Sequence, residues 1–493
     1  MPSSKPKSDA PKKVPAEPKV VAESALAASK KAPQPMQLIR GMRDILPVDQ
    51  PHWQRVYDAF NRIAEAYGFD RIDTPFVEET NLFVRGVGKA TDIVEKELFS
   101  WETPGGEHIS LRPEGTASVV RAYIQHGMLN QPQPVKLWYA GPMFRYERPQ
   151  AGRFRQHFQG GFECIGESDA IIDAQLIIIS WNILKELGLD PVVRINSLGS
   201  PESRNNYKNA LVAYFRSKRN ALSEDDKKRL LKNPLRLLDS KDPAIQELKA
   251  EAPQIVDWLD EESKGHFMRV LEYLDEVGVP YQLDPYLVRG LDYYTKTVFE
   301  WYASSEDQEL AQSALGGGGR YDGLVEQLGG RPTPSAGFGL GLDRIISRLK
   351  EQEQQGQVQV PMKRIHVFLA QLGDMGRKRA LSLFEEFRKE GLAVGEGFAK
   401  TQLKAQMELA NRRHARWTIL VGQKEVLEGT AILRDMDSGT QEIIDAKKAV
   451  HEIKKRLAGL KEMGVSVDDM PATSGWMPNP VEEGAADKKT RST

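Results

Sequence analysis

The chain has 493 residues but a single cysteine, Cys164. One cysteine excludes, within one chain, both a disulfide framework and a zinc site built from cysteines. We therefore expect a reducing compartment, the cytoplasm, with Cys164 as a small buried apolar residue. No apolar run approaches the ~18 residues of a membrane-spanning helix. The 68 basic and 69 acidic residues nearly cancel, so any contact with nucleic acid must use local patches.

Biased segments at both ends and towards the C-terminal third divide the chain. Residues 1–34 are rich in Lys, Ala, Pro and Ser and lack the apolar core of a signal peptide, so they predict a disordered tail. A lysine arm that touches RNA is the alternative for this tail. Residues 351–362, polar and rich in glutamine, predict a linker between a first region at 35–350 and a second at 363–460. Residues 461–493 predict another disordered tail.

The stretch GPMFRYERPQAGRFRQHFQGGFECIG, residues 141–166, predicts a strand, a polar loop and a second strand. Alternation along 153–163 places three phenylalanines on one face and a polar set on the other: Arg153, Arg155, His157, Gln159, Gly161 and Glu163. A hairpin brings Arg145 beside Arg153. Arginine offers planar, bidentate donors to phosphate oxygens, and Glu163 can neutralise a cation. The polar face suits ATP together with an amino acid, although a plain surface strand is the alternative.

This stretch resembles motif 2 of the class II aminoacyl-tRNA synthetases, most closely that of the histidyl-tRNA synthetase family. The helix expected at 53–67 and the strand at 71–77 resemble motif 1, which forms the dimer interface in the family. ISLRPEGT (109–116) resembles the family segment that holds the substrate α-amino group. LVRGLDYY (287–294) and GGRYDGL (318–324) resemble the two histidine-specific motifs, and SAGFGLGLDRII (335–346) resembles motif 3.

The resemblance implies a fold and a reaction. The fold class is an α+β catalytic domain with a mostly antiparallel sheet, flanking helices and a helical insertion at about 196–274. Strands alternating with helices over 363–460 predict a mainly parallel sheet, and this region resembles the α/β anticodon-binding domain. The implied enzyme is a histidine–tRNA ligase, which joins histidine to ATP as histidyl-adenylate and transfers it to the 3′ end of tRNA(His). Mg²⁺ is expected with the ATP phosphates, no metal site in the protein itself, and a homodimer.

The resemblance also implies residue roles on the nucleotide side. Arg145 and Arg289 hold the α-phosphate and are the expected catalytic residues, while Arg153 and Arg344 hold the β and γ end. At the position where the family usually stacks a phenylalanine on adenine, this chain has His157, followed by Phe158. The adenine contact therefore stays open between these two residues.

On the amino-acid side, Glu163 and Tyr294 are expected to hydrogen-bond the two imidazole nitrogens. The α-amino group is assigned to Glu114, Thr116 and Gln159. The complete expected histidine pocket comprises Glu114, Gly115, Thr116, Gln159, Glu163, Arg289, Tyr293, Tyr294 and Tyr321.

Three further features have two interpretations each. The basic clusters at 227–229 and at Arg412, Arg413, His414 and Arg416 indicate either RNA patches or solvated charges. Gln150 in the predicted hairpin loop indicates either a contact with the acceptor end or a solvated glutamine. A non-catalytic regulator of histidine biosynthesis and a tRNA-sensing pseudo-synthetase are the rival functions. Both predict eroded motifs, whereas this chain keeps Arg145, Arg289 and Arg344.

Overall fold

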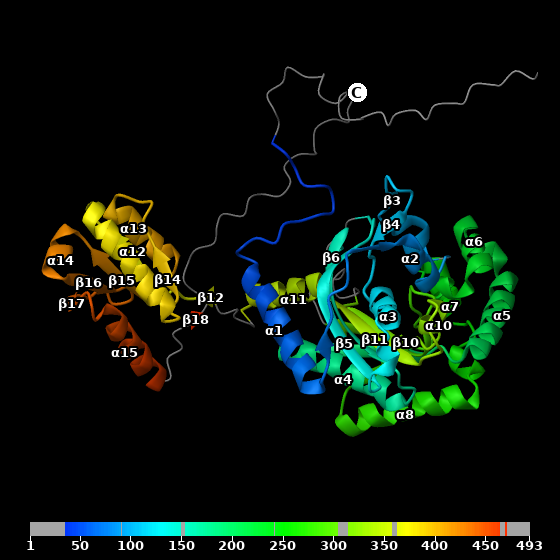
Figure 1. Ribbon diagram of the computed structural model, residues 1–493. Coiled ribbons are helices and arrows are strands. Elements are labelled where there is room, and N and C mark those ends of the chain that lie inside the picture. The colour runs from blue at the N-terminus through cyan, green and yellow to red at the C-terminus, as the bar shows by residue number, and fades with distance from the viewer. Residues whose placement is uncertain are drawn as a thin grey trace, which may run out of the picture.

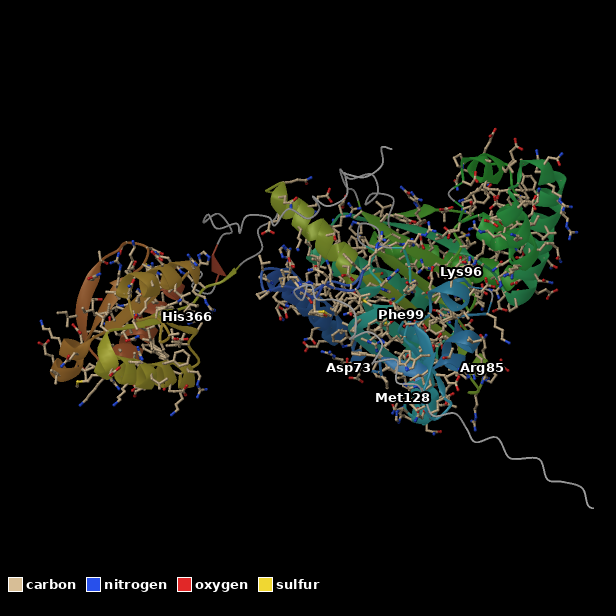
Figure 2. The ribbon with its side chains drawn as sticks, turned by 90° about the horizontal axis from the view of Figure 1, so that it is seen from above. Asp73, Arg85, Lys96, Phe99, Met128 and His366 are labelled. Carbon is tan, nitrogen blue, oxygen red and sulfur yellow. The ribbon has the colours of Figure 1, made fainter. Side chains whose placement is uncertain are left out.

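The computed structural model describes residues 35–89, 91–148, 153–240, 242–303, 314–356, 362–463 and 469–470. The expectations for residues 1–34, for Gln150 and for nearly all of 461–493 lie outside these ranges. Figure 1 shows two groups of elements, one from α1 to α11 and one from β13 to α15. Figure 2 places Lys96 and Phe99 in the first group and His366 in the second. None of the helices in the described ranges has the length and apolar character needed to cross a membrane.

An eight-stranded sheet organises the first group, in the order β1-β5-β6-β11-β10-β9-β7-β8. The edge pairs β1–β5 and β7–β8 are parallel and the other pairs are antiparallel, which confirms the expected mostly antiparallel sheet. The strand bounds are Asp70–Arg71, Val135–Phe144, Gln156–Ile165, Ser335–Gly341, Gly316–Arg320, Thr295–Ala303, Pro191–Ser197 and Tyr281–Leu283, in the same spatial order.

The helices α1 (Gln50–Tyr67), α4 (Ala170–Glu186), α8 (Glu261–Val277) and α11 (Leu342–Gln354) share one apolar core with this sheet. Phe162 of β6 lies at its centre and stacks on Phe338 of β11 at 5.1 Å between ring centroids. Because side chains alternate along a strand, burial of Phe162 against the helices places Glu163 on the opposite face. The predicted division of this strand into two faces is thereby confirmed, although β6 begins at Gln156 instead of 153.

Several expected elements differ in their bounds. The strand predicted at 71–77 is split: β1 ends at Arg71, and β2 (Val77–Glu79) joins a separate small sheet with β4 (His108–Leu111) and β3 (Ser100–Glu102). The extended stretch expected at 287–288 forms no strand. The predicted linker begins later than 351, because α11 continues to Gln354. Cys164 is buried, as expected, and burial raises the pKa of its thiol to about 11.

The insertion is helical, as expected, with α5 (Pro201–Ser217), α6 (Glu224–Lys232), the short turn η4 (Pro234–Leu237) and α7 (Pro243–Lys249). The amphipathic pattern of residues 253–279 predicts one helix, but the observed helix begins at Glu261, because the carboxylate of Asp260 caps it by accepting from the Ser263 amide. That helix, α8, packs against α4 in the main core. The polar insertion therefore ends before α8.

The second group has its own sheet, in the order β14-β13-β15-β16-β17. Its strands are Val394–Glu396, Val367–Gln371, Trp417–Val421, Thr430–Asp435 and Gln441–Asp445, covered by α12 (Gly373–Lys389), α13 (Leu403–Arg412), α14 (Gln423–Glu428) and α15 (Ala449–Glu462). The first two strand pairs are parallel and the last two antiparallel. The prediction of a mainly parallel sheet is thus wrong for its second half, where β16 and β17 form a hairpin closed by Gly439 at φ 75°.

A buried ion pair connects the sheet to α4. Arg320, fully buried at the end of β10, donates to Asp173 at 2.6 and 2.9 Å, and His266 of α8 lies 2.7 Å from the same carboxylate. We expect Asp173→Ala to lower the free energy of unfolding by about 3–5 kcal/mol, because it leaves the buried guanidinium with only the partly exposed Asp322, at 3.2 Å, as a carboxylate partner. Denaturant unfolding measures this loss. The matched control Glu186→Ala removes an exposed pair with Arg62 and should cost at most about 1 kcal/mol; equal losses in both variants would contradict the role of the buried pair.

Candidate active site

A cavity of about 170 Å³ lies over the face of β6 that carries Gln159 and beside the start of α11. Its lining includes four arginines from separate parts of the chain: Arg145, Arg153, Arg289 and Arg344. The structure thus brings together all the arginines expected at the nucleotide. Their contacts with a ligand stay a prediction.

Each cavity arginine has a protein partner. Glu147, in the loop after β5, lies 3.2 Å from Arg153 and 3.9 Å from Arg145. Arg289 pairs with Glu300 of β9, and Arg344 donates to the carbonyl of Ala314. Sequence reasoning missed Glu147, although its position two residues after Arg145 on a predicted hairpin was a usable signal. Burial, and then the charge of Arg153, lowers the pKa of Arg344. The cavity therefore favours an anion.

His157 and Phe158 both line this cavity, but their other neighbours differ. The ring of Phe158 packs edge-on against Trp53 of α1 at 4.8 Å and belongs to the partly buried rim of the core. His157 follows Gln156 on the strand and lines the cavity in the neighbourhood of Arg145, Arg153 and Arg344. Burial and these cations lower its pKa to about 3, so the imidazole is neutral near physiological pH. Both residues present a neutral flat ring at the cavity, so the choice between them for the adenine contact stays open.

The glycines of β11 have a different role from the expected one. The sequence predicts that Gly337, Gly339 and Gly341 leave a bare surface for a flat ligand. At the first two positions an added Cβ would instead overlap the protein's own side chains, Glu163 at Gly337 and Gln159 at Gly339. Strand pairing sets Gly337 opposite Glu163 and Gly339 opposite Gly161. These two glycines therefore give β6 space for its polar side chains.

Glu163 is the centre of a second, adjoining cluster. Its side chain is fully buried, and its carboxylate accepts from Tyr321 at 2.5 Å, from Thr116 at 2.7 Å and from Tyr139 at 3.4 Å. These partners are hydroxyl groups, and burial raises the pKa of Glu163 to about 8. Such a carboxyl group suits a ligand that brings an N–H donor or a positive charge.

Tyr139 on β5 is a site residue that sequence reasoning missed. It pairs with Gly161 of β6, and a Cβ at Gly161 or at Gly115 would overlap its ring. Gly115, expected in the histidine pocket, therefore acts by leaving room for Tyr139. The glycine in the middle of an otherwise substituted strand was the signal for a large side chain on the neighbouring strand.

Glu114 caps a helix as well as lying in the site. Its two carboxylate oxygens accept from the amides of Thr116 and Ala117, at 2.7 and 2.8 Å, at the start of α3 (Thr116–Gln125). The sequence had predicted Thr116 as the cap, but the hydroxyl of Thr116 donates to Glu163. Each carboxylate oxygen has a second lone pair, so Glu114 keeps capacity for an ammonium group.

The loop at 286–294 supplies the remaining predicted residues. The ring of Tyr293 lies tilted against that of Tyr294 and edge-on to that of Tyr321, at 4.7 and 5.6 Å between centroids. The guanidinium of Arg289 lies 5.6 Å from the centre of the Tyr294 ring and also lines the cavity shared with the other three arginines. Arg289 thus joins the two halves of the site. An added Cβ at Gly317 would come within 2.8 Å of its Nη1 atom, so that glycine leaves space for the arginine.

The first basic cluster is largely neutralised by its neighbours, and the second only in part. Lys227 and Lys228 pair with Glu224 and Asp225 in the first turn of α6, at 2.8 and 3.4 Å. In the second group, Arg416 pairs with Asp435 at 3.0 Å, whereas Arg412 and Arg413 are exposed. Solvated charge is the better description of 227–229.

Comparison with known proteins agrees with this geometry. The family model described as histidyl-tRNA synthetase matches residues 41–345, which is more than half of the chain. The chain belongs to the histidyl-tRNA synthetase family. A model of the anticodon-binding domain matches residues 366–456 of the second group.

Relatives of this family match along nearly their whole length. A histidine–tRNA ligase of Dehalococcoides mccartyi is 45% identical over 419 residues, covering 85% of this chain and 99% of the relative. One from Halorhodospira halophila is 45% identical over 405 residues, covering 81% and 93%. Among solved structures, apo histidyl-tRNA synthetase of S. aureus superposes with a TM-score of 0.71 at 34% identity, covering 85% of this chain and 100% of that one.

The protonation of Glu163 generates a pH-dependent prediction. Its pKa rises from an ordinary 4.5 to about 8 on burial, so between these values the folded protein binds a proton that the unfolded chain lacks. This stabilisation is complete below pH 4.5 and is lost as the pH rises through about 8. The Glu163→Gln variant has no titratable group at this position, so it does not lose stability in this way as the pH rises. We therefore expect its melting temperature to rise relative to that of the unsubstituted protein between about pH 6 and about pH 9. A difference that stays constant with pH would mean that Glu163 is already ionised in the folded protein.

Proposed function

We propose that the protein is a histidine–tRNA ligase that makes histidyl-adenylate from histidine and ATP and transfers the histidyl group to tRNA(His). The observation that carries the proposal is the joining, at Arg289, of an arginine-lined cavity to a buried cluster of hydroxyls around Glu163. The first suits a triphosphate and the second an imidazole. The matched relatives, which are histidine–tRNA ligases, support the same reaction over a regulatory role.

In the first step, an oxygen of the histidine carboxylate attacks the α-phosphorus, and the bond to the β-phosphate breaks to release pyrophosphate. Negative charge grows on the α-phosphate oxygens, so fixed cations beside them lower the barrier. We assign this role to Arg145 and Arg289, and the β and γ phosphates to Arg153 and Arg344. Glu147 and Glu300 hold three of these guanidiniums in place, which reduces the reorganisation needed when ATP binds.

Recognition of histidine follows from the second cluster. We assign the two imidazole nitrogens to Glu163 and Tyr294, with Tyr293 and Tyr321 around the ring. A substrate without ring nitrogens would leave buried polar groups unpaired, which gives strong discrimination. For the α-amino group we assign Glu114, Thr116 and Gln159. Oε1 of Gln159 is buried and finds no hydrogen-bond donor among the described residues, so it is available to an ammonium group.

The second step transfers the histidyl group to tRNA(His). A ribose hydroxyl at the 3′ end of tRNA(His) attacks the carbonyl carbon of the adenylate, and AMP leaves. Within the described ranges, no group of three or more His, Cys, Asp or Glu side chains is arranged to hold a metal. We propose that Mg²⁺ arrives with the ATP phosphates and neutralises part of their charge.

We further propose a cytoplasmic homodimer. Exposed apolar side chains at the small sheet support a second copy at this surface, because Phe76, Val77 and Trp101 are 50%, 40% and 44% exposed. The single buried cysteine supports a reducing compartment.

Histidine-dependent exchange of pyrophosphate into ATP tests the activity. We expect Arg289→Ala to lower the exchange rate by roughly two orders of magnitude or more, because a cation at the developing charge is lost. The control Arg62→Ala removes an exposed arginine of α1 and should leave the rate unchanged. Near-normal exchange in Arg289→Ala would remove this residue from catalysis, and no exchange in the unsubstituted protein would refute the proposed reaction.

A further inference from the structure

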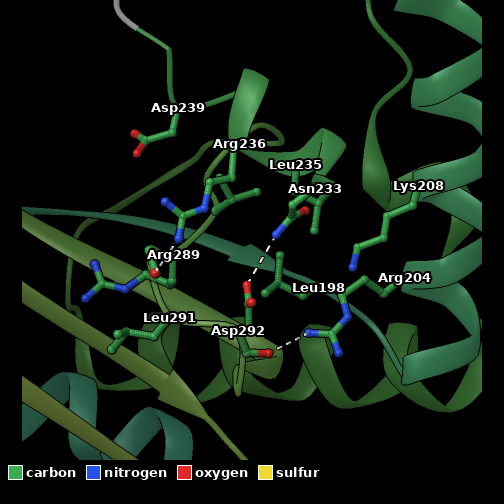
Figure 3. Close-up of a pocket in the computed structure, with 12 residues that line it drawn as sticks. Leu198, Arg204, Lys208, Asn233, Leu235, Arg236, Asp239, Arg289, Leu291 and Asp292 are labelled. Carbon is green, nitrogen blue, oxygen red and sulfur yellow. Dashed lines mark hydrogen bonds between the residues drawn. The ribbon is translucent and has the colours of Figure 1, made fainter. Parts of the chain in front are cut away.

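A second cavity, of about 180 Å³, separates the insertion from the loop that carries the histidine-specific residues (Figure 3). One wall comes from α5 and η4 of the insertion, with Arg204, Lys208, Asn233 and Arg236. The opposite wall is the stretch 288–292. Arg289 lines both this cavity and the nucleotide cavity. The loop therefore has the substrate on one side and the insertion on the other.

The loop cannot hold its own shape by backbone pairing. Residues 286–294 form neither helix nor strand, so their carbonyl groups need donors from elsewhere. Asn196 of β7 supplies one, donating to the carbonyl of Leu287 at 3.0 Å. Near the other end, the amide of Asp292 donates to the carbonyl of Val87 at 3.2 Å. Arg289 lies between these two contacts, and Tyr293 and Tyr294 follow the second.

The insertion supplies donors to the carbonyl groups of the loop from Gly290 to Tyr294. Arg204 of α5 donates to the carbonyl of Tyr294 at 2.6 Å and to that of Asp292 at 3.4 Å. Arg236 of η4 donates to the carbonyl of Gly290 at 3.0 Å, and its other nitrogen binds the carboxylate of Asp92 at 2.7 Å. Asn233 donates to the Asp292 carboxylate at 3.2 Å. Figure 3 shows these side chains reaching across the cavity toward the loop.

We propose that Arg204 and Arg236 are positioning residues of the histidine pocket, which fix the backbone of the loop so that Arg289, Tyr293 and Tyr294 face the substrate. The inference rests on the proposed function. Neither arginine lines the nucleotide cavity, so both act through the loop. The insertion is then a support of amino-acid recognition in addition to any role with tRNA.

The geometry predicts which substrate binds more weakly when these hydrogen bonds to the loop are lost. Of the four arginines that line the nucleotide cavity, only Arg289 lies on the supported loop, whereas the other three reach the cavity from the hairpin and from α11. Tyr293 and Tyr294 do lie on it and contact the ring cluster around Tyr321. Loosening the loop therefore weakens histidine binding more than ATP binding.

The test compares Arg204→Met with Lys208→Met in pyrophosphate exchange. Lys208 lies one turn further along the same helix and lines the same cavity, but among the described contacts it donates no hydrogen bond to the loop. We expect the KM for histidine to rise about tenfold or more in Arg204→Met, because the charged donor to the partly buried carbonyls of Asp292 and Tyr294 is lost. The KM for ATP in that variant, and both KM values in Lys208→Met, should stay within about twofold. Arg204→Lys, which keeps a charged donor, should give an intermediate KM for histidine.

Three results would overturn the proposal: an unchanged KM for histidine in Arg204→Met, equal rises in the KM values for histidine and ATP, or the same effect in Lys208→Met. If Arg204→Met does not fold, Arg236→Met, which removes the bond to Gly290, is judged by the same criteria. The unsubstituted protein is assayed first. Absence of exchange there would refute the proposed function alone, and calorimetric titration with histidine would still judge the role of Arg204.

Discussion

A carboxyl group buried without a cation is the constraint around which this site is built. Glu163 is fully buried, and its hydrogen-bond partners are the hydroxyls of Tyr321, Thr116 and Tyr139. Burying such a group is costly unless its bonding capacity is used, so the surrounding chain is adapted to it. Gly337 is a glycine because Glu163 occupies the space of its side chain, and Gly161 and Gly115 leave room for Tyr139. In the proposed function, the ring N–H of histidine completes this environment.

The nucleotide side of the site, in contrast, has an excess of positive charge. There the chain gathers guanidiniums, and a few carboxylates hold them in place without cancelling the local excess of positive charge. The low pKa of His157 and the lowered pKa of Arg344 both reflect this excess together with burial. A triphosphate is the ligand that relieves it. Arg289 belongs to both halves of the site, and its loop is supported from behind by the insertion. In the proposed function, this arrangement holds the amino acid and the nucleotide at a fixed distance from each other.

Much of this arrangement was predictable from local sequence. Alternation on one strand gave the face shared by His157, Gln159 and Glu163, and motif resemblance placed Arg145, Arg289 and Arg344 together. The polar, amphipathic pattern of 224–232 predicts a helix and the apolar run of 417–421 predicts a strand, and α6 and β15 have these bounds. The resemblance also gave the fold class, which the matched family and the antiparallel sheet confirm.

What escaped prediction depends on contacts between distant segments. Tyr139 joins Glu163 only through the register of β5 on β6, and Glu147 meets Arg153 only when the hairpin closes. The antiparallel half of the second sheet requires β17, whose sequence QEIID has too weak an apolar pattern to predict a strand. The supporting bonds of Arg204 link α5 to backbone carbonyls, and a backbone carbonyl has no sequence signature.

The most direct test of this account is a crystal structure of the protein with histidine and a non-hydrolysable ATP analogue bound. The account predicts an imidazole between Glu163 and Tyr294, with the triphosphate among Arg145, Arg153, Arg289 and Arg344. An imidazole bound away from Glu163, or a triphosphate that none of these arginines contacts, would contradict it.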